Sequence, residues 1–337
     1  MPQLLQLTKN ERNNLKILYL AKLAPLSFDN PEPSYDQEEG VVPVYHHNLF
    51  KSLVELELDV TPSRHIDHLL IQNRSYNYVF SILNRARFRN SEILVSSVCE
   101  YLQIAYLGAR PHARSLAEDK HLTKTLALTL GIETANWSLY RTGEAIDMPP
   151  HFPGPFFVKP RFGAASETID ADSIQDDWPA LRKRICVLHD QGLDVIVEKF
   201  IDGENVTIPV INAANPVVLP CVEDITDAPG GILTYRLNRL LEPGMKRRSF
   251  HEEKPVQAMT TAAKSILPHI SPVDYFRIDF RVEKITRTPY LLEINICCNL
   301  GQHSNIAIPA AEIGIEYSDL LEHILAFSTR RQHLFCN

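Results

Sequence analysis

The stretches YFRIDF at residues 275–280 and PYLLEIN at residues 289–295 decide the fold, because each alternates apolar and polar side chains as a half-buried strand does. In a β-strand alternate residues share a face. If the two strands are neighbours, their polar side chains lie together on one surface. Those side chains are Arg277, Asp279, Glu293 and Asn295.

This polar surface has two interpretations. Carboxylate and amide oxygens suit Mg²⁺, which proteins bind through one or two carboxylates together with substrate phosphates. An arginine beside two carboxylates also fits a structural ion pair. The apolar residues between them are expected to face a core: Phe276, Ile278, Phe280, Leu292 and Ile294.

A candidate phosphate-binding group lies upstream. Lys159 is near the end of the apolar run FFVKP and comes shortly before the small-residue loop GAAS. A lysine at a strand end can meet phosphate oxygens while the N–H groups of such a loop close over them. Taken alone, Lys159 fits a surface lysine before a turn equally well.

The segment VIVEKFIDGENVTI, residues 195–208, is an apolar strand that runs into a glycine turn. Such a segment can offer backbone hydrogen bonds and an apolar wall to an adenine ring, and Glu204 can accept hydrogen bonds from ribose hydroxyls. Taken alone, the pattern is more typical of a hairpin with solvated acidic residues.

The composition excludes several function classes. Of 337 residues, 45% are hydrophobic and 22% charged, and the net charge of −7 indicates no basic surface for nucleic acid. No apolar run approaches the roughly 20 residues that cross a bilayer, and the N-terminus lacks a signal-peptide pattern. The 6 cysteines and 13 histidines show no metal-ligand spacing. We therefore expect a cytoplasmic protein without membrane or nucleic-acid partners, disulfides or zinc.

The pattern of predicted elements changes along the chain. Up to about residue 110, strands alternate with helices, which indicates a parallel sheet with crossover helices. One helix is then expected over residues 113–131, ended by Gly131. Farther along, strand-like runs broken by Gly and Pro indicate a mixed α+β arrangement. We predict an α/β lobe at residues 1–110 and two α+β lobes at residues 111–205 and 206–337.

In order and spacing, these segments resemble the ATP-grasp superfamily and, within it, the D-alanine–D-alanine ligase-like branch. The resemblance covers about residues 99–327 and is weaker over the first lobe. The matching motifs are CEYLQIAYLGARP, LAEDKHLTK, FFVKPRFGAAS, VIVEKFIDGENVTIPVI, YFRIDF, LLEIN and HSNIAIPAAEIGIEYSDLLEHIL. The resemblance implies an ATP-grasp fold, with an N-terminal Rossmann-like lobe and two α+β lobes that clasp ATP.

The resemblance also implies a role for each matching residue. The ATP phosphates would be held by Lys120 and Lys159 beneath a loop of Gly163, Ala164, Ala165 and Ser166. The adenosine would lie against Glu198, Lys199, Phe200 and Ile201, with Glu204 at the ribose. Magnesium, as two ions that Mn²⁺ can replace, would be coordinated by Asp279, Glu293 and Asn295.

Two further roles follow from the resemblance. Arg277 would stabilise the negative charge on the transferred phosphoryl group or on a tetrahedral intermediate. The family's third ATP lysine lies on a mobile loop before the last strands. Lys246 is the candidate in YRLNRLLEPGMKRRS, with Arg247 and Arg248 as open alternatives. The surrounding segment, residues 225–250, is the candidate lid.

The acceptor half departs from the family's pattern. In D-alanine–D-alanine ligases a Pro-Gly-Met-type turn follows this asparagine, and its glycine and a later serine contact the second amino acid. Here the turn reads ICCNLGQHS, which keeps Ser304 as a catalytic and substrate-binding candidate but has Cys298 and Asn299 in place of Pro-Gly. The first lobe lacks a Ser-Ala-Glu motif, and Glu38 and Glu39 are the candidate amine-binding carboxylates.

The function implied is an ATP-dependent carboxylate–amine ligase that joins amino acids or amines through an acyl phosphate. The altered turn favours small-molecule biosynthesis over cell-wall D-alanine ligation. The alternatives are cyclisation of one amino acid and a nucleotide-binding regulatory pseudo-enzyme, although the intact lysines and carboxylates speak against the latter. A nucleophilic role for Cys297 or Cys298 is disfavoured, since this chemistry needs no thiol. A homodimer is expected by analogy alone.

Overall fold

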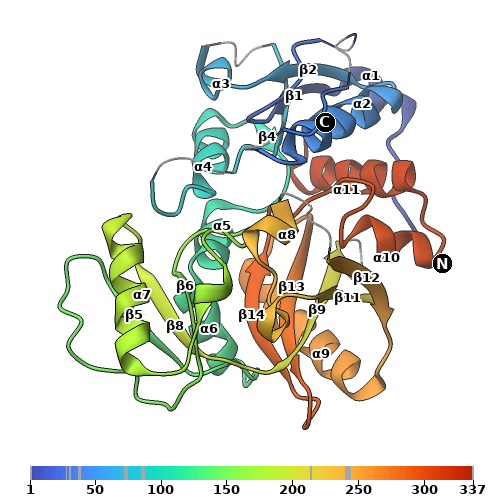
Figure 1. Cartoon of the computed structure of the whole chain (residues 1–337). Helices are drawn as coiled ribbons and strands as arrows, with labels where there is room; N and C mark the ends of the chain where they lie inside the picture. The colour runs from blue at the N-terminus through green and yellow to red at the C-terminus, as the bar shows by residue number, and fades with distance from the viewer. Residues whose placement is uncertain are drawn as a thin grey trace.

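The computed structural model describes residues 2–27, 29, 32–36, 39–71, 75–84, 88–212, 215–239 and 244–335. In this part of the chain the strands form three sheets. The first sheet lies at the top of Figure 1, and the second and third lie side by side below it. None of the helices described here is both long and apolar enough to span a membrane.

The first sheet is parallel throughout, with the strand order β2-β1-β3-β4. Its strands are β1 (Lys16–Leu20), β2 (Asp59–Ser63), β3 (Tyr78–Ser81) and β4 (Ala105–Tyr106). The helices in this part of the chain are α1 (Lys9–Asn14), α2 (Val42–Glu55), α3 (Asp67–Ile71) and α4 (Ile93–Leu102). Parallel neighbours need long crossover connections, which are usually helical. The predicted Rossmann-like lobe is confirmed.

The second sheet is antiparallel, with the order β5-β8-β6-β7. Its elements are β5 (Trp137–Tyr140), β6 (Phe156–Pro160), the 3-10 helix η1 (Ala171–Ser173), β7 (Ile174–Gln175) and β8 (Val195–Lys199). Helix α7 (Trp178–Asp190) packs Leu181 and Ile185 against Val158 and Val197 on one face. Because side chains alternate along a strand, Lys159 and Glu198 point from the opposite face.

The third sheet is also antiparallel, with the order β12-β11-β9-β13-β14 and with β10 paired to β9. The strands are β9 (Gly203–Ile211), β10 (Val217–Val218), β11 (Cys221–Thr226), β12 (Met245–Phe250), β13 (Tyr275–Glu283) and β14 (Pro289–Asn295). Helix α9 (Glu253–Ile270) shares one apolar core with this sheet, in which Met259 and Ile266 are buried with Phe276 and Ile278. The other face carries the polar residues of YFRIDF and LLEIN.

The helix predicted over residues 113–131 is two helices, α5 (Pro111–Glu118) and α6 (Lys120–Thr129). They are separated by Asp119, whose Oδ1 accepts hydrogen bonds from the N–H groups of His121 and Leu122 at 3.0 and 3.4 Å. An N-cap aspartate satisfies the donors that a new helix leaves unpaired, so the cap outweighs the continuous helical pattern. As a result, Lys120 begins a new helix at the edge of the pocket.

The pairing of β13 with β14 slips partway along. Asp279 lies opposite Glu293, whereas Phe280 lies opposite Leu291, so β14 has a bulge. An extra residue in one strand moves the side chains that follow it to the other face. Leu291 is therefore buried in the core and Leu292 lines the pocket, and the prediction that Leu292 faces the core is wrong.

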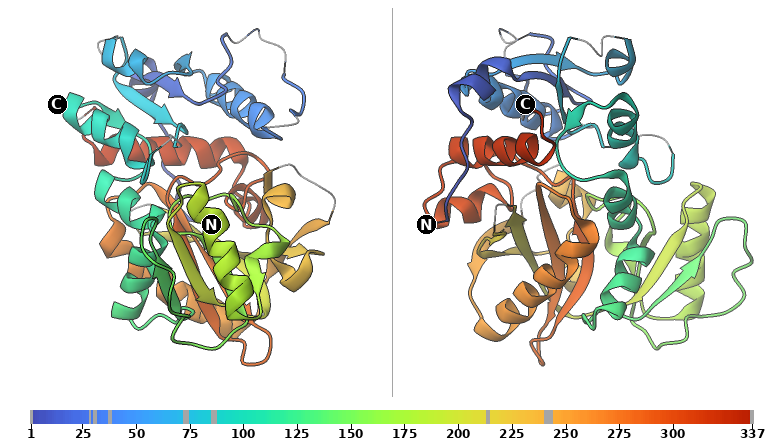
Figure 2. Two further views of the ribbon diagram at one scale, coloured as in Figure 1. Left: turned by 60° about the vertical axis from the view of Figure 1, so that its left-hand side comes forward. Right: turned by 180° about the vertical axis from the view of Figure 1, so that it is seen from behind.

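The last helix, α11 (Tyr317–Arg331), follows α10 (Ala307–Glu312) and lies between the first sheet and the third in both views of Figure 2. Leu321 and Ile324 of α11 are buried in one core with Tyr19 of β1. The N-terminal arm is joined to the same helix, because the N–H of Leu5 donates to Nδ1 of His323 at 2.8 Å. Helix α11 therefore completes the apolar core of the first lobe.

Candidate active site

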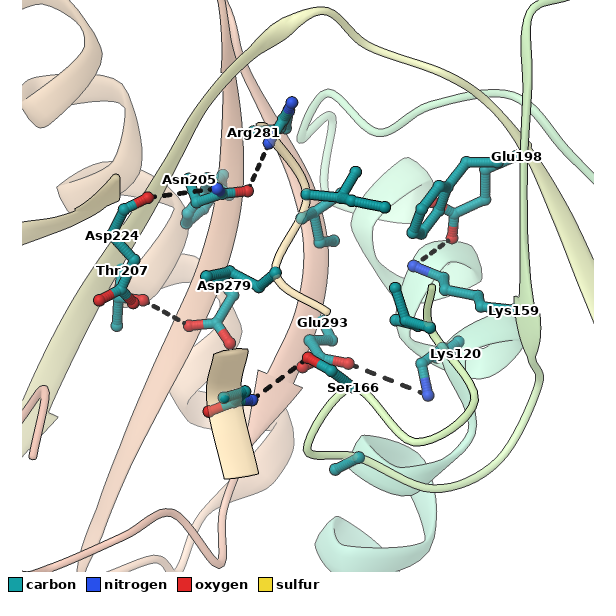
Figure 3. A pocket seen from close by; sticks show the side chains of 18 of the residues that line it. Lys120, Lys159, Ser166, Glu198, Asn205, Thr207, Asp224, Asp279, Arg281 and Glu293 are labelled. Atoms are coloured by element: carbon teal, nitrogen blue, oxygen red, sulfur yellow. Dashed lines mark hydrogen bonds and ion pairs between the residues drawn. The ribbon is translucent and has the colours of Figure 1, made fainter. Parts of the chain in front are cut away.

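A pocket opens between the second and third sheets, and Figure 3 shows its polar side chains. Lys159 and Glu198 come from the second sheet, and Asp279 and Glu293 come from the third. The pocket brings together many of the residues singled out in the sequence. These are Lys120, Lys159, Gly163, Ala164, Ser166, Glu198, Lys199, Phe200, Ile201, Arg277, Asp279 and Glu293.

The carboxylates of Asp279 and Glu293 form the centre of the third sheet's polar face. Oδ1 of Asp279 accepts a hydrogen bond from the Thr207 hydroxyl at 2.7 Å. The Asn295 amide donates to Asp279 at 2.8 Å and to Glu293 at 3.3 Å. Nη2 of Arg277 lies 3.4 Å from Oδ2 of Asp279. The arginine, two carboxylates and amide are thus adjacent.

The two carboxylates differ in their electrostatic surroundings. Burial raises the pKa of Asp279 to about 6, with Arg277 opposing this rise and the Glu293 charge adding to it. Burial also acts to raise the pKa of Glu293, but Lys120, Lys159 and Arg277 together hold it below its usual value. A cation between the carboxylates would relieve the cost of ionising Asp279.

The donor set fits Mg²⁺ on two conditions. Within the described part of the chain, no group of three or more His, Cys, Asp or Glu side chains could hold a metal. Magnesium would therefore need phosphate oxygens as well as Asp279 and Glu293, which is its usual manner of binding. Asn295 points its Nδ2 at both carboxylates, so its amide must turn before its oxygen can serve as a ligand.

Two lysines face the carboxylates across the pocket. Nζ of Lys159 lies 2.9 Å from Oε1 of Glu198, and Nζ of Lys120 lies 3.9 Å from Oε2 of Glu293. Lys120 also donates to the carbonyl oxygen of Gly163 at 2.5 Å, so it contacts the small-residue loop. Ammonium groups so placed can meet phosphate oxygens between the two sheets.

Lys124 is a further lysine beside Glu198 that was not singled out from the sequence. It is fully buried, with Nζ 3.2 Å from Oε1 of Glu198 and donating to the Thr134 hydroxyl at 2.8 Å. Burial lowers the pKa of Lys124 to about 8, although Glu198 opposes this effect. Lys124 lies one helical turn after Lys120 in KHLTK, a spacing that puts both on one face and could have revealed it.

Glu198 is thereby held between two ammonium groups, those of Lys124 and Lys159. Burial alone would raise the pKa of Glu198, but the two lysines outweigh it and leave the pKa below its usual value. A buried carboxylate with this many cationic partners remains ionised. Glu198 therefore fixes the position of Lys159 as well as lining the pocket.

The loop over the lysines has an unusual backbone. Gly163, Ala165, Ser166 and Thr168 all have positive φ, at 93°, 59°, 57° and 62°. Non-glycine residues in this region cost about 1–2 kcal/mol each, and such strain clusters at ligand sites. Ser166 accepts a hydrogen bond from Asn238 at 3.2 Å, which joins the loop to the covering segment. Ala165 belongs to the loop without lining the pocket.

The covering segment includes the 3-10 helix η2 (Pro229–Gly231) and the short helix α8 (Tyr235–Arg239). Ile232, Leu233 and Asn238 line the pocket from this side. Arg281, which was not singled out in the sequence, donates to the carbonyl of Gly231 at 2.8 Å. The described part of the predicted lid therefore contacts both walls.

The apolar end of the pocket is formed by Phe200 and Ile201 after β8. The Arg281 guanidinium lies 5.7 Å from the centroid of the Phe200 ring. Glu204 does not line the pocket, and its Oε2 lies 2.6 Å from Nη2 of Arg287, so its contact with ribose stays a prediction. The next residue, Asn205, lines the pocket instead, since neighbouring side chains on a strand face opposite ways.

The same alternation separates the three cations of β12. Lys246 and Arg248 are exposed and outside the pocket, and Arg248 pairs with Glu223 at 2.6 Å. Arg247 faces the pocket and donates from Nε to Oδ1 of Asp224 at 2.7 Å. Arg247 is the cation of β12 that lines the pocket, and which of the three contacts the nucleotide stays a prediction.

Of the predicted substrate residues, Arg277 lines the pocket, whereas Ser304, Asn299 and Glu39 do not. Ser304 is buried, and its Oγ accepts from the N–H of Ala307 at 3.1 Å as a cap of α10. Asn299 is exposed and accepts from the N–H of Gly301 at 2.7 Å. Glu39 pairs with Lys22. Glu38 falls outside the described residues. The substrate roles of these residues stay predictions.

The surroundings of the adjacent cysteines disfavour a nucleophilic role, although Arg114 donates to the sulfur of Cys297. Burial raises the pKa of Cys297 well above its usual value, although Arg114 opposes the shift. Burial likewise raises the pKa of Cys298 to about 12, with Arg277 opposing it. A thiol is reactive as the thiolate, so a raised pKa disfavours nucleophilic catalysis by either residue.

Two antiparallel sheets that close on a pocket lined by lysines and carboxylates, beside a Rossmann-like lobe, form the fold of the ATP-grasp enzymes. Residues 129–326 match the family model described as D-ala D-ala ligase C-terminus. The chain belongs to this family and is an ATP-dependent, ADP-forming C–N ligase.

Individual relatives agree with this assignment. The chain is 28% identical to a D-alanine–D-alanine ligase of Polaromonas sp. (strain JS666), with 68% of this chain and 69% of the relative covered. It is 27% identical to the uncharacterized protein y4sG of Sinorhizobium fredii, covering 76% and 74%.

Two solved structures share the fold. The D-alanine–D-alanine ligase of Bacillus anthracis complexed with ATP has a TM-score of 0.71 at 20% identity, covering 96% of this chain and 99% of that one. The VanG D-Ala:D-Ser ligase of Enterococcus faecalis has a TM-score of 0.69 at 15% identity, covering 94% and 99%. The predicted ATP-grasp fold is confirmed.

Proposed function

We propose that this protein is a cytoplasmic enzyme that activates a substrate carboxylate with ATP as an acyl phosphate and joins it to an amine. The observation that carries the proposal is the opposition, within one pocket, of Lys120 and Lys159 to Asp279 and Glu293. Phosphoryl transfer requires positioning and charge neutralisation more than covalent help from the protein, and this arrangement provides both.

Each group has a separate task in the proposed reaction. The substrate carboxylate attacks the γ-phosphorus of ATP, and ADP leaves. Lys120 and Lys159 neutralise phosphate oxygens, and Arg277 stabilises charge on the transferred group. Asp279 and Glu293, with Asn295 after its amide turns, would hold Mg²⁺, which supplies further neutralisation of the phosphates. The amine then attacks the acyl carbon, and inorganic phosphate leaves.

An acyl phosphate must be protected from water until the amine arrives. The contact between Asn238 and Ser166 links the covering segment to the phosphate loop over the pocket. Such closure excludes water and strengthens the electrostatic interactions inside. The same segment must open for the substrates to enter and for ADP and product to leave.

We further propose that the substrates are amino acids or amines of small-molecule biosynthesis rather than two D-alanines for the cell wall. Support comes from the acceptor turn, where Cys298 is buried and the adjacent Asn299 is exposed. This pair replaces the Pro-Gly expected of D-alanine–D-alanine ligases. The homodimer stays a prediction that analytical ultracentrifugation can check.

The deciding experiment measures ADP release with pools of D- and L-amino acids and amines in the presence of Mg²⁺ and ATP. We expect release only when a carboxylate and an amine substrate are both present. Release with one amino acid alone would indicate cyclisation instead. ATP binding without release from any pool would reject the enzymatic proposal in favour of a nucleotide-binding regulator.

A further inference from the structure

A second group of polar side chains lies beyond the carboxylate pair, at the far side of the third sheet. The strand order β14-β13-β9-β11-β12 places Asp224 of β11 and Arg247 of β12 on the side of Asp279 away from Glu293. Figure 3 shows Asp224 and Thr207 on the opposite side of Asp279 from Lys159. Asn305, which precedes α10, completes the group, and all of these residues line the pocket.

The members of this group hold one another in place, and Asp224, Thr207 and Asn305 are buried. Asp224 and Asn305 have only 5% and 4% of their surface exposed. Oδ2 of Asp224 accepts from Nδ2 of Asn305 at 2.8 Å, and Oδ1 accepts from Nε of Arg247 at 2.7 Å. Arg247 also donates to the carbonyl oxygen of His303 at 2.8 Å. The negative charge of Asp224 is thus compensated by the Arg247 guanidinium before any ligand binds.

One atom of the group has no partner. Oδ1 of Asn305 is buried, and no donor among the described residues lies within hydrogen-bonding distance of it. The amide cannot turn to repair this, because its oxygen would then face the Asp224 carboxylate, which accepts but does not donate. Buried acceptors are nearly always paired in native proteins. An unpaired acceptor on a residue that lines a substrate pocket indicates that the missing donor arrives with a ligand.

We propose that Asn305 determines substrate specificity by accepting a hydrogen bond from an N–H or O–H group on the side chain of the amine substrate, with Asp224 holding the amide in place. The proposal rests on the proposed function, which puts the amine substrate next to the transferred phosphoryl group. The reacting amine must approach the acyl carbon near Arg277. A donor that reaches Asn305 is therefore a separate group of the same molecule.

This chemistry predicts a preference for an amino acid with a hydroxyl or amino group on its side chain over the alkyl analogue of similar size. A substrate that lacks the donor leaves Oδ1 of Asn305 unpaired in the complex. Sites built around a buried polar group reject such analogues more strongly than apolar pockets reject an added hydroxyl. Asn305 is thus a binding residue for the amine rather than part of the phosphate machinery.

The test measures equilibrium binding by titration calorimetry on the whole chain saturated with Mg²⁺ and a non-hydrolysable ATP analogue. The probes are serine against 2-aminobutyrate and 2,3-diaminopropionate against 2-aminobutyrate, each in both configurations. We expect the donor-bearing member of at least one pair to bind about 10-fold or more tightly. Asn305→Leu should abolish this ratio, and Asp224→Asn should reduce it, because the Asn305 amide is then free to turn.

The control is Gln302→Leu, a change from a polar to an apolar side chain at an exposed position of the same turn, which should leave the ratio unaltered. Binding of the ATP analogue confirms that each variant is folded. The proposal is overturned if neither pair binds to the wild-type protein, if the two members of each pair bind equally, or if Asn305→Leu keeps the ratio. A preserved ratio in Asp224→Asn alone, with a loss in Asn305→Leu, still supports Asn305.

The outcome is separable from that of the proposed function, because binding is measured without turnover. A donor preference lost in Asn305→Leu, without ADP release from any pool, would reject the ligase reaction but keep the assignment of Asn305. ADP release with equal use of both members of each pair would keep the ligase reaction and reject the assignment.

Discussion

Asp279 and Glu293 lie directly opposite each other on β13 and β14, yet their pKa values shift in opposite directions. The difference arises from Lys120 of α6 and Lys159 of β6, which lower the pKa of Glu293, whereas the main cation near Asp279 is Arg277. A cation bound beside Asp279 would therefore favour the ionised form of this carboxylate, and we propose that a nucleotide-bound cation lies there.

The first prediction concerns this pair. Asp279→Asn and Glu293→Gln keep the size of each side chain but remove a charged ligand, and each should lower the rate of ADP release by about 100-fold or more. Release is measured at saturating ATP and Mg²⁺, with binding of ADP in the absence of metal as the control for folding. A rate within about threefold of the wild type would overturn the metal assignment.

The second prediction decides among the cations of β12. Arg247 lines the pocket and donates to Asp224, whereas its neighbour Lys246 does not line the pocket. Arg247→Met should reduce kcat/KM by about 10-fold or more, because it also leaves the buried Asp224 carboxylate without its cation. Lys246→Met is the matched comparison and should stay within about twofold of the wild type, since exposed charges contribute little. A larger loss of kcat/KM in Lys246→Met than in Arg247→Met would instead indicate that Lys246 contacts the nucleotide.

The third prediction tests Glu198 as the link between two lysines. Glu198→Gln leaves the ammonium groups of Lys124 and Lys159 facing each other without a carboxylate, which should cost about 3–5 kcal/mol of stability. Calorimetry should show a lower melting temperature, and adding Lys124→Met should restore part of it because the effects of contacting residues are not additive. Additive losses in the double variant would show that the three groups do not act together.

The fourth prediction follows from the lowered pKa of Lys124, which is about 8 in the folded chain against 10.5 for the ordinary side chain. Between these pH values the unfolded chain binds a proton that the folded chain does not. This group's contribution to stability therefore rises with pH across that window, by up to about 1.4 kcal/mol per pH unit, and is lost as pH falls through 8.

Lys124→Met removes this dependence. The melting temperature of the wild-type protein minus that of the variant should therefore increase between pH 8 and pH 10. The exposed Lys183→Met is the control, and its difference from the wild type should not change with pH. A constant difference for Lys124→Met as well would show that Lys124 titrates normally.

Much of the candidate site could be predicted because its residues lie on regular strands next to recognisable motifs. The two-residue period of YFRIDF and LLEIN was enough to group Arg277 with Asp279 and Glu293 with Asn295. The errors occur where that period is set by something the sequence does not display. The bulge in β14 places Leu292 in the pocket lining. The alternation of side chains along β9 likewise places Asn205, and not Glu204, in the pocket lining.

Other residues could be identified only in part, because their environment is tertiary. The spacing of Lys124 after Lys120 places both on one helix face, but its partner Glu198 is brought to it by β8, far along the chain. Asp224 and Asn305 are 81 residues apart, and although Asn305 lies in the motif that begins HSNIAIP, nothing in the sequence indicates its contact with Asp224. The parallel order of the first sheet could be inferred from the alternation of strands with helices, but the contribution of α11 to its core could not, because no local pattern encodes a contact over such a distance.

The contribution of α11 to the core of the first lobe affects how the chain folds during synthesis. The hydrogen bond from Leu5 to His323 spans 318 residues, and Tyr19 of the first strand shares its core with Leu321 and Ile324. During synthesis, the N-terminal lobe emerges first but lacks part of its apolar covering until α11 has left the ribosome. Exposed apolar surface of this kind is where aggregation and chaperone binding begin. The first lobe therefore reaches its final packing only after α11, which is synthesised much later, is available.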